Sequence, residues 1–217
     1  MRFTSCFKNG IISIRKEAIH MEHGSNICVF GASSNMIDER FKRDAFEVGR
    51  LIAESGFGLV FGAGDSGLMG QAARGAHSAG GRIIGVIPEK LNKPGVYFEH
   101  CTERIETPTM HERKAKMEEL SAGFIALAGG FGTIEELMEV MTLKQLSYID
   151  PAIVILNTAG CYDPLIAQLD RCFTEGFAHE GYRSLYYAAS TPAEAVAYCA
   201  EYRGSNFPDK LIYALRR

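Results

Sequence analysis

Residues 109–117 carry side chains whose types and spacing are typical of a site for an anionic ligand. Met110, Arg113 and Met117 fall at i, i+3 and i+7, so that a guanidinium shares one helical stripe with two methionines. A buried guanidinium needs an anionic partner, whereas a side chain on an ordinary amphipathic helix reaches solvent. Both interpretations stay open from the residues alone.

A second segment, residues 128–136, is a glycine-rich turn that leads into a helical pattern. Glycine lets a backbone come close to a ligand, and the N–H groups that open the next helix favour a phosphate. The residues of interest are Gly129, Gly130, Gly132, Thr133 and Glu136. Thr133 and Glu136 also fit a capping box in which Thr133 is the N-cap. If they instead flank a phosphate, a nearby Arg or Lys must offset the carboxylate, and Glu135 points elsewhere.

Two further glycine turns follow predicted strands. Residues 31–34 contain Ser33, and residues 62–67 contain Gly64. The second turn matches G-x-G-x-x-G, with Glu89 at the distance of the acidic residue in a dinucleotide fingerprint. That fingerprint normally occupies the first strand–helix turn, and here an earlier strand and turn precede it. A nicotinamide-dinucleotide oxidoreductase is therefore a minor alternative.

The elements that position these residues alternate between strand and helix patterns. Short apolar runs predict buried strands at 26–30, 58–61, 82–87, 123–127, 152–156 and 184–188. Longer amphipathic patterns predict helices at 38–55, 67–79, 109–121, 133–148, 163–178 and 192–203. This alternation predicts an α/β fold, a doubly wound, mostly parallel Rossmann-like sheet flanked by helices. Ligands bind such sheets at the carboxyl ends of the strands, where all three glycine turns lie.

The chain reads as one nucleotide-binding domain over residues 25–217, preceded by an N-terminal extension at 1–24. Residues 88–108 are the one irregular stretch, and they are expected to form a loop that covers a site.

Composition excludes several classes of function. A net charge of −3 argues against a nucleic-acid partner. The apolar runs are too short to span a bilayer, and the six scattered cysteines suit reduced thiols in the cytoplasm. His111 and Glu112 begin an H-E-x-x-H pattern, but Ala115 takes the place of the second histidine. No metal and no cofactor are therefore expected.

At residues 110–117 and 128–136 the chain resembles the LOG ("lonely guy") family of cytokinin riboside 5′-monophosphate phosphoribohydrolases, once labelled lysine decarboxylases. The family motif M-H-x-R-K-x-x-M is met in full. The motif P-G-G-x-G-T-x-x-E is met at all positions but the first, where Ala128 replaces proline. The likeness extends over residues 26–190 and includes the two earlier glycine turns.

The resemblance implies hydrolysis of the N-glycosidic bond of an adenosine 5′-monophosphate, with or without an N6 modification, to free base and ribose 5-phosphate. It assigns catalysis to Arg113 and Glu136 and the phosphate to the Gly129–Thr133 turn. It also has Lys114 support the ligand and Met110 border the base. A carboxylate can stabilise the oxocarbenium-like state, and an arginine can offset charge on the departing base. Ala128 leaves the phosphate turn without the rigid φ of proline.

The main alternative is a protein of the same fold that carries a nucleotide or cofactor without turnover. Glu136 favours the enzyme, because a carrier needs no carboxylate beside a phosphate. The helix at 133–148 has apolar residues on more than one face, which predicts a homodimer built mainly on this helix and the helix at 109–121.

Overall fold

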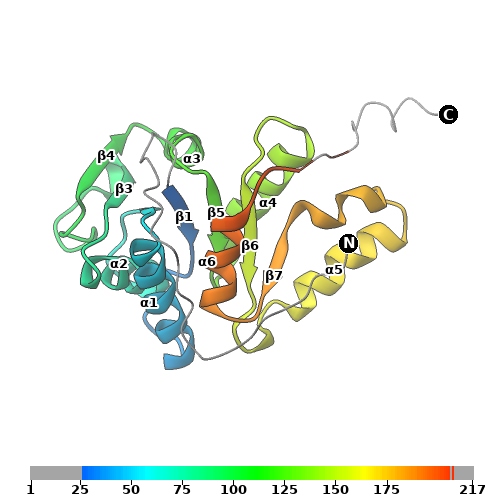
Figure 1. The fold of residues 1–217 in the computed structure, drawn as a ribbon. Coiled ribbons are helices and arrows are strands. Elements are labelled where there is room, and N and C mark those ends of the chain that lie inside the picture. The colour runs from blue at the N-terminus through cyan, green and yellow to red at the C-terminus, as the bar shows by residue number, and fades with distance from the viewer. Residues whose placement is uncertain (1–25, 206, 208–217) are drawn as a thin grey trace.

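The middle layer of the fold is a parallel sheet whose central strands are buried on both faces (Figure 1). The computed structural model describes residues 26–205 and 207. Within these residues seven strands pair in the order β4-β3-β2-β1-β5-β6-β7, all parallel. They are β1 (Asn26–Phe30), β2 (Gly58–Phe61), β3 (Ile83–Pro88), β4 (Glu103–Thr107), β5 (Gly123–Ala126), β6 (Ala152–Leu156) and β7 (Tyr187–Ala189). The predicted α/β class and parallel sheet are confirmed.

Helices cover both faces of the sheet, because the strands present apolar side chains to both faces. The helices are α1 (Glu39–Glu54), α2 (Gly67–Ser78), α3 (Met110–Glu119), α4 (Phe131–Gln145), α5 (Asp163–Thr174) and α6 (Pro192–Glu201). Ile27 and Val29 of β1 belong to a core shared with α1, α2 and α6. Cys28 and Phe30, which point the other way, belong to a core shared with α3, α4 and α5.

Glycines bring α1 and α2 into direct backbone contact. A Cβ built on Gly49 of α1 would lie 1.8 Å from the carbonyl oxygen of Ala72, and one on Gly75 of α2 would lie 1.9 Å from that of Phe46. Side chains at either position would force the helices apart. This packing fixes the position at which α2 begins, next to the second glycine turn.

The direction of winding reverses between β1 and β5. From β1 the chain adds β2, β3 and β4 on one side, and then returns to place β5 on the other side of β1. The turns after these two strands are joined, because the Ala32 N–H donates to the Ala128 carbonyl at 3.1 Å and the Leu127 N–H donates to the Phe30 carbonyl at 2.9 Å. Ligands of doubly wound sheets bind at this reversal, so the predicted residues can be located against it.

Two sequence predictions need correction. Residues 88–108, predicted to be irregular throughout, contain the edge strand β4 and a 3₁₀ turn, Glu89–Leu91. The strand predicted at 184–188 overlaps the observed strand, but it was placed too early: Ser184 and Leu185 end another 3₁₀ helix, Glu180–Leu185, and β7 begins at Tyr187. A third 3₁₀ turn, Thr158–Gly160, was not predicted. The predicted extension at residues 1–24 lies outside the described residues.

Candidate active site

A cavity of about 580 Å³ lies over the reversal point, at the carboxyl ends of β1, β2, β3 and β5. This volume is within the range of small-molecule sites. Eight of the ten predicted site residues line it: Ser33, Gly64, Met110, Arg113, Gly130, Gly132, Thr133 and Glu136. Gly129 and Lys114 are not part of the lining. Residues from three separate glycine turns and from α3 therefore meet in one space.

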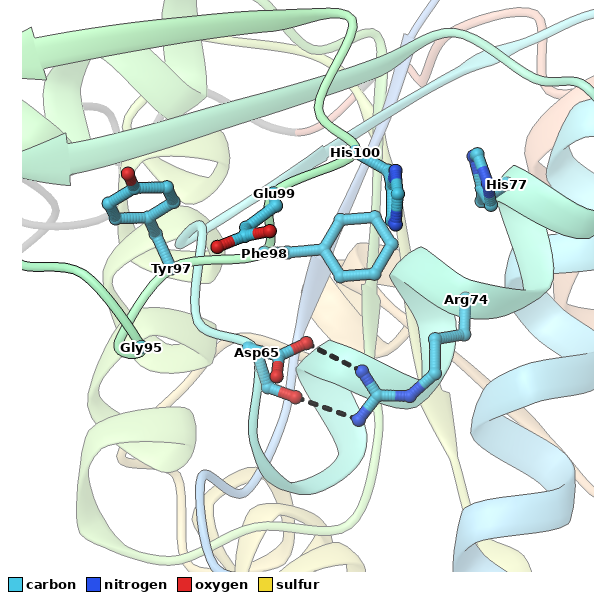
Figure 2. A pocket seen from close by; sticks show the side chains of 8 residues that line it. All are labelled: Asp65, Arg74, His77, Gly95, Tyr97, Phe98, Glu99 and His100. Atoms are coloured by element: carbon cyan, nitrogen blue, oxygen red, sulfur yellow. Dashed lines mark hydrogen bonds and ion pairs between the residues drawn. The ribbon is translucent and has the colours of Figure 1, made fainter.

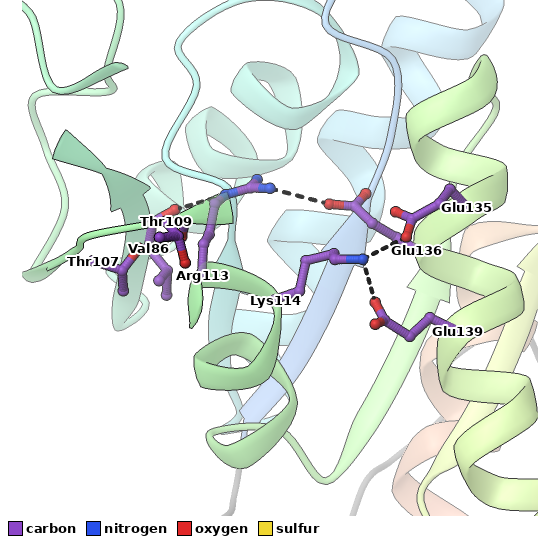
Figure 3. A network of polar contacts seen from close by, with 8 residues as sticks. All are labelled: Val86, Thr107, Thr109, Arg113, Lys114, Glu135, Glu136 and Glu139. Carbon is purple, nitrogen blue, oxygen red and sulfur yellow. Dashed lines mark hydrogen bonds and ion pairs between the residues drawn. The ribbon is translucent and has the colours of Figure 1, made fainter. Parts of the chain in front are cut away.

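Arg113 is buried, with a side chain only 8% exposed, so the prediction of a buried guanidinium is confirmed over the solvent-exposed alternative. Its Nε donates to the Val86 carbonyl at 3.1 Å, and its Nη1 donates to Glu136 Oε1 at 3.2 Å (Figure 3). Met117, one turn further along, is packed in the core, while Met110 remains half exposed in the cavity. The guanidinium is thus held at a fixed place by a backbone carbonyl and a carboxylate.

Glu136 is the anionic partner that Arg113 requires. Its side chain is 13% exposed. Burial raises the pKa of the Glu136 carboxyl above its ordinary value, and the charge and hydrogen bond of Arg113 lower it in part. The pair therefore offers a carboxylate in a weakly solvated place, close to a fixed cation.

The helix that carries Glu136 begins two residues earlier than predicted. Its N-cap is Gly130, which has no side chain to cap the helix, and the first intrahelical bond runs from the Ile134 N–H to the Gly130 carbonyl at 3.0 Å. The prediction that Thr133 is the N-cap of a capping box with Glu136 is therefore wrong. The amides of Phe131, Gly132 and Thr133 have no intrahelical acceptor, and these three residues are part of the cavity lining. The helix start is suited to an anion.

Gly129 supports this turn from behind the cavity wall. A Cβ at Gly129 would lie 2.1 Å from Thr133 Oγ1, so a glycine is needed for Thr133 to reach its buried place. The Tyr162 hydroxyl donates to the Leu127 carbonyl at 2.7 Å and fixes the strand end that leads into the turn. No cis peptide bond occurs among the described residues, so Ala128 enters the turn through a trans bond.

Lys114 does not line the cavity, and Figure 3 shows its side chain extending toward α4. Its ammonium pairs with Glu135 and with Glu139 Oε2, the second at 2.8 Å. Neither of these carboxylates lines the cavity. The expectation that Glu135 points away from the ligand site is confirmed, and the structure does not bring Lys114 to the cavity.

The second glycine turn does not present a free helix start, which argues against a dinucleotide. At the start of α2, the Gly67 N–H donates to Asn35 Oδ1 at 2.8 Å and the Leu68 N–H donates to the Ala32 carbonyl at 2.8 Å. Gly62, the first residue of the fingerprint, lies against the Arg113 guanidinium. Gly67 therefore serves packing against the first turn, and Gly62 serves packing against the arginine.

A strap at residues 92–100 closes one side of the cavity, which fits the prediction that this region covers a site. The Asp65 N–H donates to the Val96 carbonyl at 3.0 Å and the Phe98 N–H donates to the Ala63 carbonyl at 2.8 Å. Val96, together with Leu91 just before the strap, lines the cavity. Neither residue was predicted, since nothing in this stretch has a strand or helix period.

The other side of the strap borders a second cavity, of about 410 Å³ (Figure 2). Arg74 lies in its wall, but its guanidinium is engaged by Asp65, with Nη1 bonded to the carboxylate at 2.7 Å and Nη2 to the carbonyl at 2.8 Å. The rings of His77 and His100 stack on each other with centroids 4.5 Å apart. These contacts brace the second turn and the strap.

Three general properties of the described residues bear on the remaining predictions. They contain no group of three or more His, Cys, Asp or Glu side chains placed to bind a metal ion. None of their helices combines the length and apolar character that a membrane crossing needs. Their five cysteines are free thiols: Cys28, Cys101, Cys161, Cys172 and Cys199.

Solved structures share this fold. The molybdenum cofactor binding protein of the phototrophic bacterium Rippkaea orientalis superposes with a TM-score of 0.63 at 22% identity, over 80% of this chain and 94% of that one. The Moco carrier protein of Chlamydomonas reinhardtii superposes with a TM-score of 0.60 at 25% identity, over 81% of this chain and 95% of that one.

Similarity in sequence is closer to a group of plant enzymes. Residues 69–199 match a family model described as "Possible lysine decarboxylase". The cytokinin riboside 5′-monophosphate phosphoribohydrolase LOG of Oryza sativa subsp. japonica is 39% identical over 81% of this chain and 73% of its own length. LOG3 of Arabidopsis thaliana, which bears the same enzyme name, is 35% identical over 88% of this chain and 89% of its own length. With this identity over most of its length, the chain belongs to the LOG family.

Proposed function

We propose that this protein hydrolyses the N-glycosidic bond of an adenosine 5′-monophosphate, with or without an N6 substituent, to free base and ribose 5-phosphate. The observation that carries the proposal is the buried Arg113–Glu136 pair, 3.2 Å apart, in the wall of a cavity that also contains the start of α4. The names of the relatives, phosphoribohydrolases of a cytokinin nucleotide, support the same reaction.

The 5′-phosphate binds at the start of α4 in this proposal. The amides of Gly130–Thr133 and the positive end of the helix dipole favour an anion, and the small side chain of Ser33 on the facing turn leaves room for it. Gly129 acts indirectly, by making space for Thr133. Gly64 lets the backbone of the second turn come close to the sugar.

Arg113 and Glu136 act at the glycosidic bond. The bond between C1′ and the base nitrogen breaks with its electron pair going to the base, which takes up a proton. The Glu136 carboxylate stabilises the positive charge that develops at C1′ and orients the water whose oxygen bonds to C1′. Arg113 holds the carboxylate in place and offsets negative charge on the departing base. One water is consumed. Its hydroxyl bonds to C1′ of ribose, and its remaining proton makes up for the proton that the base takes up.

The base lies against the apolar part of the cavity in this arrangement. Four apolar side chains of the lining are exposed to solvent: Leu91, Val96, Met110 and Phe131. Met110, from the same helix as Arg113, borders the base on the side of the arginine. Burying such side chains against an aromatic ring contributes about 25 cal/mol per Å² of apolar surface removed from water.

The decisive experiment incubates the purified protein with AMP and, separately, with an N6-substituted AMP. Chromatography of the free base, with a colorimetric assay of the reducing sugar, should show equal amounts of base and ribose 5-phosphate. Absence of free base from both nucleotides would reject the enzyme. A crystal grown with phosphate should hold the anion on the amides of Gly130–Thr133. An anion at Gly62–Gly67 instead, with the third turn closed, would favour a dinucleotide.

A carrier of a nucleotide or cofactor is the second candidate, and the likeness to the Moco carrier protein favours it. A carrier would bind its ligand at the same cavity and release it unchanged. Tight binding of a nucleotide with no release of base over hours would support this alternative. The Glu136 carboxylate beside the helix start speaks for the hydrolase, because it weakens the binding of an anion and serves no purpose without turnover.

We further propose a cytoplasmic homodimer that uses α3 and α4. The free cysteines fit a reducing compartment. On α4, Leu137, Val140 and Met141 are buried within the chain, which accounts for part of the apolar pattern. Leu146, at the end of α4, and Tyr148, just beyond it, stay exposed and are available to a second copy.

A further inference from the structure

Lys114 follows Arg113 on α3, yet the two cations serve different carboxylates. Arg113 pairs with Glu136, and both residues line the cavity. Lys114 pairs with Glu135 and Glu139, none of which lines it (Figure 3). The Lys114 side chain is 18% exposed, whereas its partners Glu135 and Glu139 are 55% and 28% exposed. Its ammonium does not belong to the cavity lining.

Three carboxylates therefore stand on the first turns of α4, the helix whose start is offered to the phosphate: Glu135, Glu136 and Glu139. Carboxylates repel an anionic ligand, and more strongly where water is partly excluded, so the balance of these charges matters for a phosphate. Arg113 balances one of them, and Lys114 faces the other two.

The same charges act on the Glu136 carboxyl. The groups that face it are Arg113 and Lys114 from α3, Cys28 from β1 and Glu135 on its own helix. Burial is the largest influence and raises its pKa, Arg113 lowers it, Glu135 raises it and Lys114 lowers it. Loss of the lysine would leave the outer carboxylates unbalanced and would favour the protonated form of Glu136.

We propose that Lys114 is a positioning residue: by pairing with Glu135 and Glu139 it offsets part of their charge, leaves Glu136 to pair with Arg113 and lowers the repulsion that the phosphate meets. It does so without touching the nucleotide. This inference rests on the proposed function and replaces the direct contact with ligand that the sequence suggested for Lys114.

The test removes Lys114 alone, and then removes it together with the two carboxylates that it pairs with. Lys114→Met should raise KM for AMP about tenfold, a change of about 1.4 kcal/mol, and move the acid limb of kcat/KM to higher pH. Lys114→Arg should stay close to the wild type. The triple variant Lys114→Met, Glu135→Gln, Glu139→Gln removes the cation together with both anions, and should return KM and the acid limb toward wild-type values.

A direct contact between Lys114 and the nucleotide predicts the opposite, since the triple variant would then remain as impaired as Lys114→Met. That result would overturn the inference. Thermal melts of all three variants establish that folded protein is compared, and the charge-neutral triple variant keeps the test valid should Lys114→Met alone be unstable.

A second readout needs no turnover. Carbon-13 NMR of labelled glutamate carboxyls, with the Glu136 signal assigned from Glu136→Gln, gives the pKa of Glu136 directly. It should rise in Lys114→Met and return in the triple variant. An unchanged titration in Lys114→Met would reject the inference, whereas a wild-type protein that releases no base, with the titration shifting as expected, would reject only the proposed hydrolysis.

Discussion

The guanidinium of Arg113 occupies the space in which a side chain on residue 62 would begin. A Cβ built on Gly62 would lie 1.7 Å from Arg113 Nη2, much closer than any two non-bonded atoms come. Gly62 does not have a positive φ, so its backbone conformation is open to any residue. The glycine is needed because the arginine crosses over it on the way to Glu136.

Gly62→Ala should displace the guanidinium and reduce activity while leaving the fold intact. The colliding atom is the end of a side chain, so a rotamer change can relieve the collision, at the cost of the contacts of Arg113 with Val86 and Glu136. A shift of about 1 Å in a catalytic group can reduce the rate about 100-fold. We expect a loss of this order in kcat/KM, with a smaller loss of stability than a collision with backbone would cause.

Gly49→Ala provides the matched control, because its Cβ would meet the Ala72 carbonyl oxygen at 1.8 Å, in the backbone of α2. A backbone collision cannot be relieved by a rotamer change, so this variant should lose about 1–3 kcal/mol of stability. Its folded fraction should keep the wild-type kcat. Equal losses of stability in the two variants would contradict the flexible displacement of Arg113.

Glu136→Gln should reduce kcat by at least about 100-fold, since it removes the charge that stabilises the transition state. AMP should bind as well as before or more tightly, because the repulsion between carboxylate and phosphate is also removed. Single-turnover assays and calorimetric titration separate the two effects. Glu135→Gln is the control and should be nearly silent, as Lys114 keeps Glu139 as a partner. Near-normal turnover by Glu136→Gln would remove the carboxylate from the mechanism.

The rate should fall in acid with a midpoint above pH 4.5. Glu136 acts in its ionised form, and burial raises its pKa above the ordinary 4.5 while Arg113 opposes the rise. The acid limb of the kcat/KM profile gives this pKa for the free protein. A midpoint at or below 4.5 would show that the carboxylate is better solvated than the structure has it.

The raised pKa of Glu136 also predicts how the stability of the protein depends on pH. Because the folded pKa exceeds the unfolded one, the group favours folding below the unfolded pKa, and this contribution is lost as pH rises through the folded pKa. Ionisation of the carboxyl therefore lowers the stability of the wild type relative to Glu136→Gln as the pH rises from below 4.5 to 7. The glutamine also leaves Arg113 without its anion, so the difference in melting temperature between the two proteins is compared across pH and not read at pH 7 alone. Scanning calorimetry at both pH values measures it.

Tyr162→Phe should weaken binding of the phosphate more than it slows the chemical step. The hydroxyl holds the Leu127 carbonyl at the entrance to the third turn, and losing a buried hydrogen bond of this kind costs about 1–3 kcal/mol. We expect KM for AMP to rise, with affinity for a phosphate-free nucleoside unchanged. Tyr198→Phe, which removes a hydroxyl on α6, should alter neither value. Equal weakening for nucleotide and nucleoside would show that Tyr162 acts on the whole cavity.

Light scattering at micromolar concentration should give about twice the 23.8 kDa mass of the chain. Leu146→Arg, at the exposed end of α4, should shift the mass toward that of one chain, since a charge opposes burial in an apolar interface. Phe177→Arg alters a more exposed apolar residue elsewhere and should leave the mass unchanged. A monomeric wild type would refute the dimer.

The sequence predicted the buried strands well because each is a short apolar run between glycines and polar turns. It failed at β4, whose residues Glu103–Thr107 read E-R-I-E-T. An edge strand needs few apolar residues, and charges on it oppose pairing with other chains, so its pattern resembles that of a loop. At 184–188 the predicted strand began too early, because Leu185 ends a 3₁₀ helix and packs in a small separate cluster, whereas β7 begins at Tyr187.

The site residues were predicted from the glycine turns and from one arginine on an otherwise apolar helical stripe, because both features are visible within a short stretch of sequence. Two things could not be read from spacing. The T-x-x-E pattern placed the start of the helix at Thr133 instead of Gly130, because a glycine N-cap has no side chain that the sequence could reveal. The direction in which the Lys114 side chain points depends on how α3 and α4 lie relative to each other in the fold. No local sequence pattern predicts that arrangement.

All side chains that line the larger cavity lie between Gly31 and Glu136 in the chain. The described part of the chain from Leu137 onward helps to hold this arrangement, through contacts such as that of Tyr162, but contributes no wall of its own. That region is therefore the place for engineering: a fluorophore or affinity tag near the exposed Phe177 would report on the protein without altering ligand access. For the same reason, orthologous sequences should drift fastest over its surface away from Leu146 and Tyr148, while residues 31–136 stay constrained.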